Sequence, residues 1–505
     1  MARLGDLLAN VEGARLLGGG PDLAIAEVRD DSRKVRPGDL FVAIPGTKHD
    51  GRAFIDEAVA KGAAAVLTAS DDGGTAELVG KVAVIVMAKP RRALGIIAAN
   101  RFRAAAPLTL TAVTGTNGKT TTTYLVEAIL TAAGRRPGVI GTVGYRFGGR
   151  VKEAPLTTPG PLELYANLAD MAQAGATDVV MEASSIALEQ DRLAGCRYRV
   201  AALTNVTQDH LDYHGTMANY FAAKSILFRE LLAGVAVLFA DDEQGLAMRH
   251  QVSGPVLTVS RQGQGADVVV ARRWLGPEGI RLRLETPAGP LELVSPLVGD
   301  FNLANILTAV GIALGHGLPP AAITTGVARL RGVPGRLEAV ANEAGVLCVV
   351  DYAHTPDALE RALDVLRPLA RGRLICVFGC GGDRDRGKRP LMGEAAARRA
   401  DIAIVTSDNP RTEEPQSIID MILPGVRRAG KPERSASELR QGQTGYHVEP
   451  DRASAISRAV GLARLGDVVL LAGKGHEDYQ IVGTEKSHFD DREVAAAAFA
   501  ARRGA

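Results

Sequence analysis

The stretch Leu108-Thr-Leu-Thr-Ala-Val-Thr-Gly-Thr-Asn-Gly-Lys-Thr-Thr121 decides the fold of the chain around it. Its first half alternates apolar residues with threonines up to Val113, which predicts a short buried strand. Its second half is rich in glycine and leads into a helical pattern of apolar residues that Gly134 ends. A strand, a glycine-rich loop and a helix in this order predict a phosphate-binding loop, in which backbone N–H groups and the helix N-terminus face phosphate oxygens.

Two side chains of this loop have the chemistry of nucleotide binding. Lys119 offers a positive charge to the phosphates, and the Thr120 hydroxyl is a ligand that Mg²⁺ accepts. The general motif has its first glycine where this chain has Val113, and Gly115 supplies a glycine two residues later. An ordinary strand–turn–helix with an exposed lysine is the alternative, but the Gly-Lys-Thr sequence favours ATP or GTP binding.

Composition excludes several classes of protein. The 505 residues are enough for three domains of ordinary size. A hydrophobic fraction of 46% and a charged fraction of 23% are typical of a globular protein, and a net charge of +2 gives no overall attraction to nucleic acid or membranes. We see no secretory signal, no membrane-spanning run and no metal-binding spacing among the four cysteines, so we expect a reduced, cytoplasmic protein without a membrane span.

Alternating strand and helix patterns predict an α/β fold with three domains. Residues 1–107 predict a small α/β N-terminal domain. Residues 108–335 predict a central ATP-binding domain with a P-loop-type, mostly parallel sheet flanked by helices, and Val252 to Leu293 forms a β-rich excursion within it. Residues 336–505, after the Gly- and Pro-containing linker 332–336, predict a C-terminal Rossmann-like domain with a doubly wound sheet.

Three polar clusters in the central region each follow an apolar run. They contain Thr157 and Thr158, Glu182, and His210. Because the carboxyl ends of parallel strands meet at one edge of a sheet, we expect Glu182 and His210 to converge with Lys119 on a metal–phosphate centre. An acid at the end of a buried strand is what a Mg²⁺ site beside a phosphate loop needs. Each residue also has a structural alternative, such as a helix cap or a surface histidine.

Two further features of this region are ambiguous from residue chemistry alone. Lys224 lies in a helical pattern soon after the His210 cluster, and a surface lysine is the simpler interpretation. Asn302 and Asn305 are three residues apart near the start of another helical pattern. Their amides therefore face the same side, which suits binding of a ligand.

The predicted strands of the C-terminal region end in residues of both charges: Asp351, Arg384, Asp408, Arg411, Lys474 and Glu477. Arg411 can pair with a carboxylate through two hydrogen bonds, and Glu477 can receive an ammonium group, so such a pocket fits a zwitterion such as an amino acid. Salt bridging between loop ends is the alternative. Gly379-x-Gly381-Gly382 lacks the third glycine and the acidic residue of a dinucleotide motif, so NAD binding is not expected.

Six polar motifs stand in an order that matches a known family. They are Thr114-Gly-Thr-Asn-Gly-Lys-Thr-Thr121, Glu182-Ala-Ser-Ser185, Asp209-His210-Leu-Asp212-Tyr-His214, Phe301-Asn302-x-x-Asn305, Pro334-Gly-Arg336 and Asp351-Tyr-Ala-His354-Thr-Pro356. Over essentially the whole chain they resemble the Mur ligases of peptidoglycan synthesis. Asp31-Ser32-Arg33 resembles the branch that adds the third residue of the peptide stem, and Asp408-Asn409-Pro410-Arg411 resembles its diaminopimelate recognition motif. Ile186 departs from that branch, which has His at this position.

The resemblance implies ATP-dependent amide formation. The γ-carboxylate of D-glutamate in UDP-MurNAc-L-Ala-D-Glu would attack the γ-phosphate of ATP, which gives an acyl phosphate and ADP. The amine of meso-diaminopimelate would then attack the acyl carbon, and phosphate would leave. The resemblance also implies Mg²⁺ as the cofactor, these three small molecules as the partners, no nucleic acid, and a monomer that acts in the cytoplasm.

The family's functional residues carry over position by position. The implied ATP-binding residues are Gly115, Thr116, Asn117, Gly118, Lys119, Thr120, Thr121, Asn302, Arg336 and Asp351. The implied UDP-dipeptide-binding residues are Ser32, in the predicted UDP-sugar-binding N-terminal domain, and Thr157, Thr158, Ser184, Gln190 and Arg192. The implied diaminopimelate-binding residues are Arg384, Asp408, Asn409, Pro410, Arg411, Gly473 and Glu477. The implied catalytic residues are Lys119, Glu182, His210 and Lys224, and the implied metal ligands are Thr120, Glu182, His210 and Lys224. Lys224 matches the family's carbamylated lysine, so the resemblance reverses its interpretation as a surface lysine.

Alternatives from two classes remain open. One is a lysine-adding or folylpolyglutamate-type ligase, and Arg411 argues against lysine because the lysine side chain lacks a carboxylate. The other is a P-loop ATPase or kinase that hydrolyses ATP or transfers phosphate without forming an amide.

Overall fold

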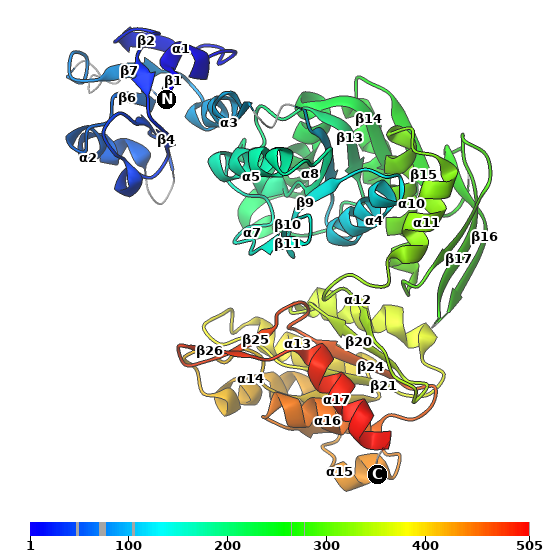
Figure 1. Ribbon diagram of the computed structural model, residues 1–505. Coiled ribbons are helices and arrows are strands. Elements are labelled where there is room, and N and C mark those ends of the chain that lie inside the picture. The colour runs from blue at the N-terminus through cyan, green and yellow to red at the C-terminus, as the bar shows by residue number, and fades with distance from the viewer. Residues whose placement is uncertain (47–49, 70–76, 104–106, 264, 277, 504–505) are drawn as a thin grey trace. The chain divides into compact units, whose positions relative to one another are not determined.

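The computed structural model describes residues 1–46, 50–69, 77–103, 107–263, 265–276 and 278–503. The chain forms two compact units (Figure 1): one comprises residues 1–271, 284–291 and 304–327, and the other comprises residues 272–283, 292–303 and 328–505. Strands and helices alternate in both, so the predicted α/β class is confirmed. The domain boundaries at residues 107 and 335 stay predictions. In the described ranges, no helix is long and apolar enough to cross a membrane.

The N-terminal part is built on a five-stranded sheet in the order β2-β7-β6-β5-β4. It is parallel except for β2, which runs antiparallel to β7. The strands are β2 (Arg15–Gly18), β4 (Val28–Arg29), β5 (Leu40–Val42), β6 (Ala65–Thr68) and β7 (Ala83–Val86), beside a short ribbon of β1 (Ala2–Arg3) and β3 (Ala24–Ile25). The helices are α1 (Leu4–Leu7), α2 (Ile55–Ala60) and α3 (Pro90–Arg101).

The central sheet has the strand order β11-β10-β9-β12-β8-β13-β14-β15-β16-β17-β18. From β9 through β12, β8, β13, β14 and β15 to β16 the pairing is parallel, as predicted. The strands are β8 (Thr109–Thr114), β9 (Pro137–Gly141), β10 (Gly144–Phe147), β11 (Arg150–Lys152), β12 (Asp178–Glu182), β13 (Tyr198–Leu203), β14 (Leu232–Phe239), β15 (Val256–Ser260), β16 (Val268–Gly276), β17 (Gly279–Glu285) and β18 (Leu291–Ser295).

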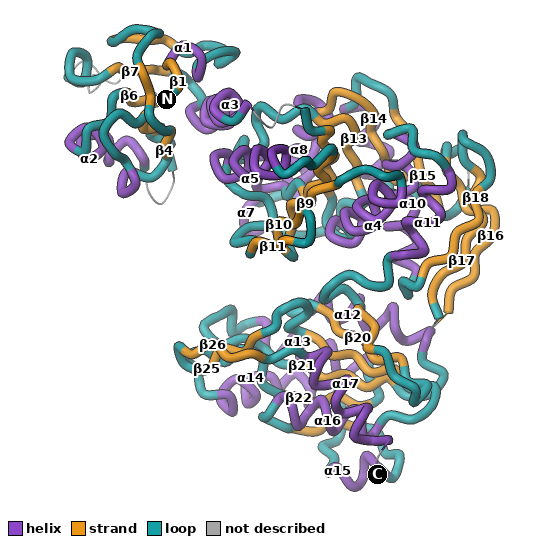
Figure 2. Tube along the Cα trace, viewed as in Figure 1, coloured by secondary structure: helices purple, strands orange, loops and turns teal. Residues whose placement is uncertain are grey.

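Helices flank these strands (Figure 2). They are α4 (Lys119–Ala132), α5 (Pro161–Gln173), α6 (Ser185–Glu189), α7 (Leu211–His214), α8 (Met217–Ile226), α9 (Glu243–Met248), α10 (Asp300–Gly315) and α11 (Pro320–Arg329). Strand β8 lies between β12 and β13, so the loop that follows it is placed next to the ends of both neighbouring strands. This order is what brings the polar clusters after these three strands to one edge of the sheet.

The C-terminal sheet has the order β19-β20-β24-β21-β22-β23 and is parallel from β20 to β23. Its strands are β19 (Glu338–Val340), β20 (Leu347–Asp351), β21 (Leu374–Phe378), β22 (Ile402–Val405), β23 (Gly445–Val448) and β24 (Val468–Ala472), and β25 (Tyr479–Val482) and β26 (Glu485–His488) form a separate hairpin. The helices are α12 (Pro356–Leu366), α13 (Lys388–Arg399), α14 (Pro415–Arg428), α15 (Ala436–Arg440), α16 (Arg452–Leu462) and α17 (Asp491–Arg503).

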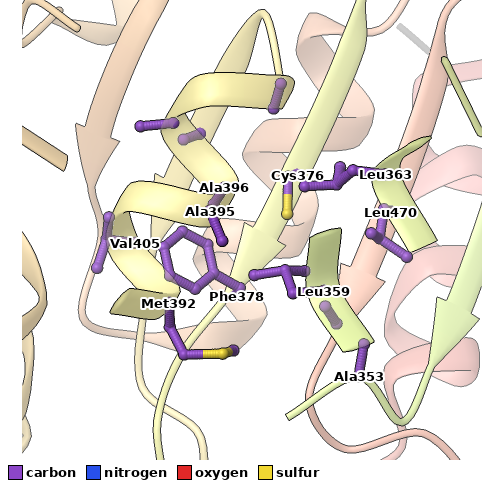
Figure 3. Packing of buried hydrophobic residues seen from close by; sticks show 14 of the residues in the cluster. Ala353, Leu359, Leu363, Cys376, Phe378, Met392, Ala395, Ala396, Val405 and Leu470 are labelled. Atoms are coloured by element: carbon purple, nitrogen blue, oxygen red, sulfur yellow. The ribbon is translucent and has the colours of Figure 1, made fainter. Parts of the chain in front are cut away.

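Two hydrophobic cores cover the opposite faces of this sheet, which confirms the predicted doubly wound arrangement. One core contains residues of α12, α13 and α14, and Figure 3 shows Leu363, Phe378, Met392 and Leu470 packed within it. The other contains residues of α16 and α17. Strands β21, β22 and β24 are buried along their whole length because both of their faces are covered.

Replacing Leu363 by alanine tests the first of these cores. The side chain is fully buried, so its loss leaves a cavity and is expected to lower the free energy of unfolding by about 2–5 kcal/mol. Thermal denaturation followed by circular dichroism measures the effect. The control is Leu391→Ala on the neighbouring helix α13, where the side chain is 51% exposed, and its effect is expected to stay below about 0.5 kcal/mol. Equal losses in both variants would contradict the packing described here.

Candidate active site

The phosphate-loop candidate joins the end of β8 to the start of α4, as predicted. Gly115 and Gly118 both have positive φ angles, of 142° and 85°, which side chains with a Cβ rarely adopt. Lys119 Nζ donates to the carbonyl oxygens of Gly115 and Thr116, each at 2.9 Å, so its side chain lies along the loop. The helix N-terminus and the lysine charge thus face the same loop, which is the arrangement that binds phosphate.

The segment after β13 holds this loop in place through hydrogen bonds. Thr116 N donates to Asn205 O at 2.8 Å, and Asn117 N donates to Asn205 Oδ1 at 3.1 Å. Thr204 Oγ1 donates to Asn117 O at 2.6 Å. Sequence reasoning did not single out Thr204 or Asn205, and the available signal was their place at the end of the predicted strand preceding His210.

Glu182 is the last residue of β12 and is 1% exposed. Its two carboxylate oxygens accept from Thr142, Oε1 from the backbone N–H at 2.9 Å and Oε2 from the hydroxyl at 3.1 Å. Thr158 Oγ1 donates to the Glu182 carbonyl at 2.8 Å. The Thr142 hydroxyl also lies 3.1 Å from Thr157 Oγ1, so the structure brings together the predicted threonines and the predicted acid. Thr142 itself was missed, because it follows β9, whose end carried no motif.

Lys224 is buried, with 1% of its surface exposed, so its interpretation as a surface lysine is wrong. Its Nζ donates to Gly115 O at 3.0 Å and lies 4.3 Å from the centre of the Tyr220 ring. Burial, with the nearby charge of Lys119 as a second cause, lowers the pKa of Lys224 well below its usual value. Helix α8 therefore places a buried amine with a lowered pKa in contact with the phosphate loop.

His210 lies at the N-terminal end of α7 with a half-exposed side chain and a positive φ of 52°. Its ring is edge-on to Tyr220 at a centroid distance of 6.4 Å, and its Nε2 is 3.6 Å from Asp209. Tyr220 therefore has His210 and Lys224 around the same ring. In the part of the chain that the structure describes, no three His, Cys, Asp or Glu side chains are grouped as a metal site.

The predicted UDP-dipeptide residues fall into two places. Arg192 is linked with three of the others, because it donates to Thr158 O at 2.9 Å and to Gln190 Oε1 at 2.8 Å, and Thr158 Oγ1 is 3.2 Å from Ser184 Oγ. Ser32 begins a short 3₁₀ helix (Ser32–Lys34) after β4 and donates to Glu57 at 3.0 Å. A cavity of about 340 Å³ is lined by Arg29, Asp30, Asp31, Lys34, Gly160, Leu162 and Glu163. These residues flank Ser32 and begin α5.

Three predicted ATP-binding residues lie in the second unit. Asp351 ends β20 and accepts from the backbone N–H groups of Leu337 at 2.8 Å and Ala353 at 2.9 Å. Burial raises the pKa of Asp351, and the nearby charge of Arg336 opposes this rise. The Arg336 guanidinium lies 5.5 Å from the Tyr352 ring. Asn302 donates to Val298 O at 2.8 Å near the start of α10.

The predicted amino-acid site gathers at the ends of β22 and β24. Asp408 is 7% exposed, and among the described residues its Oδ1 has no hydrogen-bond partner. Asn409 donates to Glu477 Oε2 at 2.8 Å and accepts from Lys474 Nζ at 3.1 Å. Burial, and then the charge of Asp408, raises the pKa of Glu477. Gly473, with a φ of 117°, lies against Asp408, where a Cβ would approach Oδ2 to 2.9 Å.

Arg411 completes this cluster with a positive φ of 51°. The β25–β26 hairpin holds its backbone, since Arg411 N donates to Ile481 O at 3.1 Å and Gly483 N donates to Arg411 O at 2.7 Å. Its Nη1 donates to Gly382 O at 2.9 Å, and Arg384 lies in the same loop as Gly382. A guanidinium has five N–H donors, so Arg411 can also donate to a bound ligand. Sequence reasoning did not predict this hairpin, although the stretch Gly473 to Gln480, which resembles the same branch of the family, runs into β25.

Comparison with known proteins gives matches along nearly the whole chain. Family models match residues 24–102 (Mur ligase family, catalytic domain), 113–313 (Mur ligase middle domain) and 335–475 (Mur ligase, glutamate ligase domain). The chain is 48% identical over 488 residues to a UDP-N-acetylmuramoyl-L-alanyl-D-glutamate–2,6-diaminopimelate ligase of Gloeobacter violaceus, covering 96% of this chain and 95% of the relative. It is also 48% identical to the ligase of that name from Synechococcus elongatus, over 96% of both chains. A solved structure with the same name is 35% identical, covers 99% of both chains and has a TM-score of 0.74.

Proposed function

This chain belongs to the Mur ligase family, and from that premise we propose that it joins meso-2,6-diaminopimelate to the D-glutamate γ-carboxylate of UDP-MurNAc-L-Ala-D-Glu. It is an ATP-dependent amide ligase of peptidoglycan synthesis, as its relatives over nearly the full length are. The folylpolyglutamate alternative is thereby set aside. Action as a monomer in the cytoplasm stays a prediction.

The observation that carries the choice of amino acid is the mixed charge of the cluster at the ends of β22 and β24. Diaminopimelate has an ammonium and a carboxylate at each end, whereas L-lysine lacks the second carboxylate. Arg411 suits that carboxylate. The Asp408 Oδ1 atom lies 3.9 Å from Lys474 Nζ and accepts no hydrogen bond from the described residues, so together with Glu477 it suits an ammonium. A buried carboxylate oxygen that accepts no hydrogen bond is costly, so a ligand that donates to it is favoured.

The chemistry needs a carboxylate and a triphosphate, both anionic, to meet. We infer that Gly115 to Thr121 bind the phosphates, while Lys119 lowers the repulsion as the carboxylate oxygen attacks phosphorus and ADP leaves. The diaminopimelate amine then forms the amide bond at the acyl carbon as the C–O bond to phosphate breaks. The remaining nucleotide contacts are assigned to Asn302, Arg336 and Asp351, and the UDP-dipeptide contacts to Ser32, Thr157, Thr158, Ser184, Gln190 and Arg192.

The residues around the phosphate loop fit Mg²⁺ as the cofactor. Glu182 is a buried carboxylate held in place by Thr142, and Thr120 adds a hydroxyl at the start of α4, so the donors are the oxygen ligands that Mg²⁺ prefers. When bound, Mg²⁺ would neutralise charge on the phosphates. We assign Thr120, Glu182, His210 and a carbamate on Lys224 to hold it. The low pKa of Lys224 supports that carbamate, because only a neutral amine takes up CO₂.

Glu182→Gln tests the Mg²⁺ assignment. Glutamine keeps the size and an oxygen for the Thr142 N–H but removes the charge, so the Mg²⁺ concentration for half-maximal rate is expected to rise at least about tenfold. The control is Asp178→Asn at the opposite end of the same strand, where the carboxylate pairs with Arg135 at 2.8 Å. That variant is expected to lose stability with little change in the Mg²⁺ requirement. An unchanged requirement in Glu182→Gln would remove Glu182 from the metal site.

A panel of amino acids tests the function as a whole. With ATP and the UDP-dipeptide present, ADP release should depend on meso-diaminopimelate, and L-lysine should support only a small fraction of that rate. A rate of ADP release that is independent of both the UDP-dipeptide and the amino acid would favour the ATPase alternative. Comparable rates with L-lysine would favour the lysine-adding alternative.

A further inference from the structure

Beneath the amino-acid cluster lies an ion pair that none of the assigned contacts uses. The side chains of Arg452 and Asp491 are both 0% exposed. Arg452 Nε donates to Asp491 Oδ1 at 2.8 Å and Nη2 to Oδ2 at 2.6 Å, which is a bidentate pair. Burial of two charges costs several kcal/mol per ion, and apolar residues in their place are often at least as stable. Stability alone therefore does not explain this pair.

The position of Arg452 in its helix is a second indication that the pair is not there for stability. It is the first residue of α16, where the positive end of the helix macrodipole disfavours a cation. Asp491, the first residue of α17, is on the favourable end of its own helix and anchors the guanidinium. The arginine at this position therefore does not stabilise either helix through the macrodipole.

The other donors of Arg452 reach the backbone of both substrate loops. Nη1 donates to Ser407 O at 3.2 Å, and Nη2 donates to Ala472 O at 3.0 Å. Ser407 directly precedes Asp408, and Ala472 directly precedes Gly473. One planar group therefore ties together the two segments that carry the charges for the amino acid.

The backbone of the sheet does not make this connection itself. Strands β22 and β24 are not neighbours, because β21 lies between them. The strand ends from which the two loops leave are therefore about two strand spacings apart, roughly 10 Å. A guanidinium with donors in a fixed fork can define that separation, whereas a lysine ammonium on a flexible stem cannot contact both carbonyls and the carboxylate in the same geometry.

We propose that Arg452, anchored by Asp491, is a positioning residue that sets the spacing between the Asp408 loop and the Gly473–Glu477 loop and so determines affinity for the amino-acid substrate. This inference rests on the proposed function, because it assigns a role to that same site. It predicts that a small change in Arg452 weakens recognition of diaminopimelate and leaves the ATP and UDP-dipeptide sites intact.

The chain offers a matched control at the other edge of the same sheet. Arg373 and the buried Asp467 form a second ion pair, in which Nε at 3.2 Å and Nη2 at 2.9 Å both donate to Oδ2. Arg373 also donates to the Leu462 carbonyl at 2.6 Å. Arg373 precedes β21 and Asp467 precedes β24, so this pair ties together the amino ends of strands whose carboxyl ends bear the site. It has the same chemistry without contact to the substrate loops.

The experiment compares Arg452→Lys with Arg373→Lys in the full-length enzyme, with KM measured for each of the three substrates. In Arg452→Lys the KM for meso-diaminopimelate is expected to rise on the order of tenfold or more, because displacement of a binding group by about 1 Å is enough for such a loss. Its KM for ATP and for the UDP-dipeptide should stay within about twofold of the native values. In Arg373→Lys all three KM values should stay within about twofold, although thermal stability falls.

Three results would overturn the inference: an unchanged KM for diaminopimelate in Arg452→Lys, a parallel rise of all three KM values, or an equal rise in Arg373→Lys. If circular dichroism shows that Arg452→Lys is unfolded, the variant Asp491→Asn replaces it in the test. That variant keeps the arginine and weakens its ion pair, and the KM for diaminopimelate alone is again expected to rise. A native enzyme that forms no product with diaminopimelate would instead contradict the proposed function.

Discussion

Replacing Lys224 by alanine is expected to lower kcat by about 10²–10³-fold, which is the size of effect seen when one charged group is removed from a preorganised site. The amine is buried beneath the phosphate loop and donates to Gly115 O. Burial lowers the pKa of Lys224, which increases the fraction of neutral amine that can take up CO₂ and become an anion. Alanine removes both the amine and the proposed carbamate.

Short carboxylates separate the carbamate from a merely structural lysine. Acetate or formate that enters the space left in Lys224→Ala is expected to restore part of the rate, while a structural role would give no such rescue. Lys152→Ala is the control, because that side chain is 61% exposed on β11 and its loss should leave the rate unchanged with or without carboxylate. Full activity of unsupplemented Lys224→Ala would refute the assignment.

The second large effect is expected for Arg411→Ala. Loss of a charge-assisted, two-bond contact to a carboxylate should lower kcat/KM for meso-diaminopimelate on the order of 100-fold. The rate with L-lysine, which has no second carboxylate, should barely change. The preference of the enzyme for meso-diaminopimelate over L-lysine should therefore be largely lost. The native φ of 51° is uncommon for arginine and alanine alike, so this substitution changes the side chain more than the backbone strain.

The control for Arg411→Ala is Arg398→Ala on α13. Arg398 pairs with Glu394 at 2.6 Å on the same helical face and is 58% exposed. Its removal should leave kcat/KM unchanged for both meso-diaminopimelate and L-lysine. If Arg411→Ala keeps its preference for diaminopimelate, the carboxylate contact belongs to another residue, and Arg384 in the neighbouring loop is the first to test.

Several parts of the site could be predicted from sequence because their signals are local. The alternation before Val113 and the helical spacing after Lys119 lie within one stretch, and both β8 and α4 are where these patterns place them. Glu182 follows an apolar run and does end a buried strand. The resemblance to Mur ligases likewise rests on short motifs, and the family comparisons confirm it.

Other parts depend on which strands become neighbours, and no local pattern encodes this. Thr142 contacts Glu182 only because β9 lies beside β12, although 40 positions separate the two residues. Arg452 reaches Ser407 and Ala472 only because β24, formed late in the chain, inserts between β20 and β21.

The phosphate loop, the α/β class and the family follow from local sequence, because hydrophobic period and motif spacing act over a few residues. The burial of Lys224 against that loop, and the contact of Arg452 with both substrate loops, became visible in the folded chain and not before. The physical reason is that burial, and with it the pKa of an amine or the worth of an ion pair, depends on every segment packed around a group. Those segments come from distant parts of the chain.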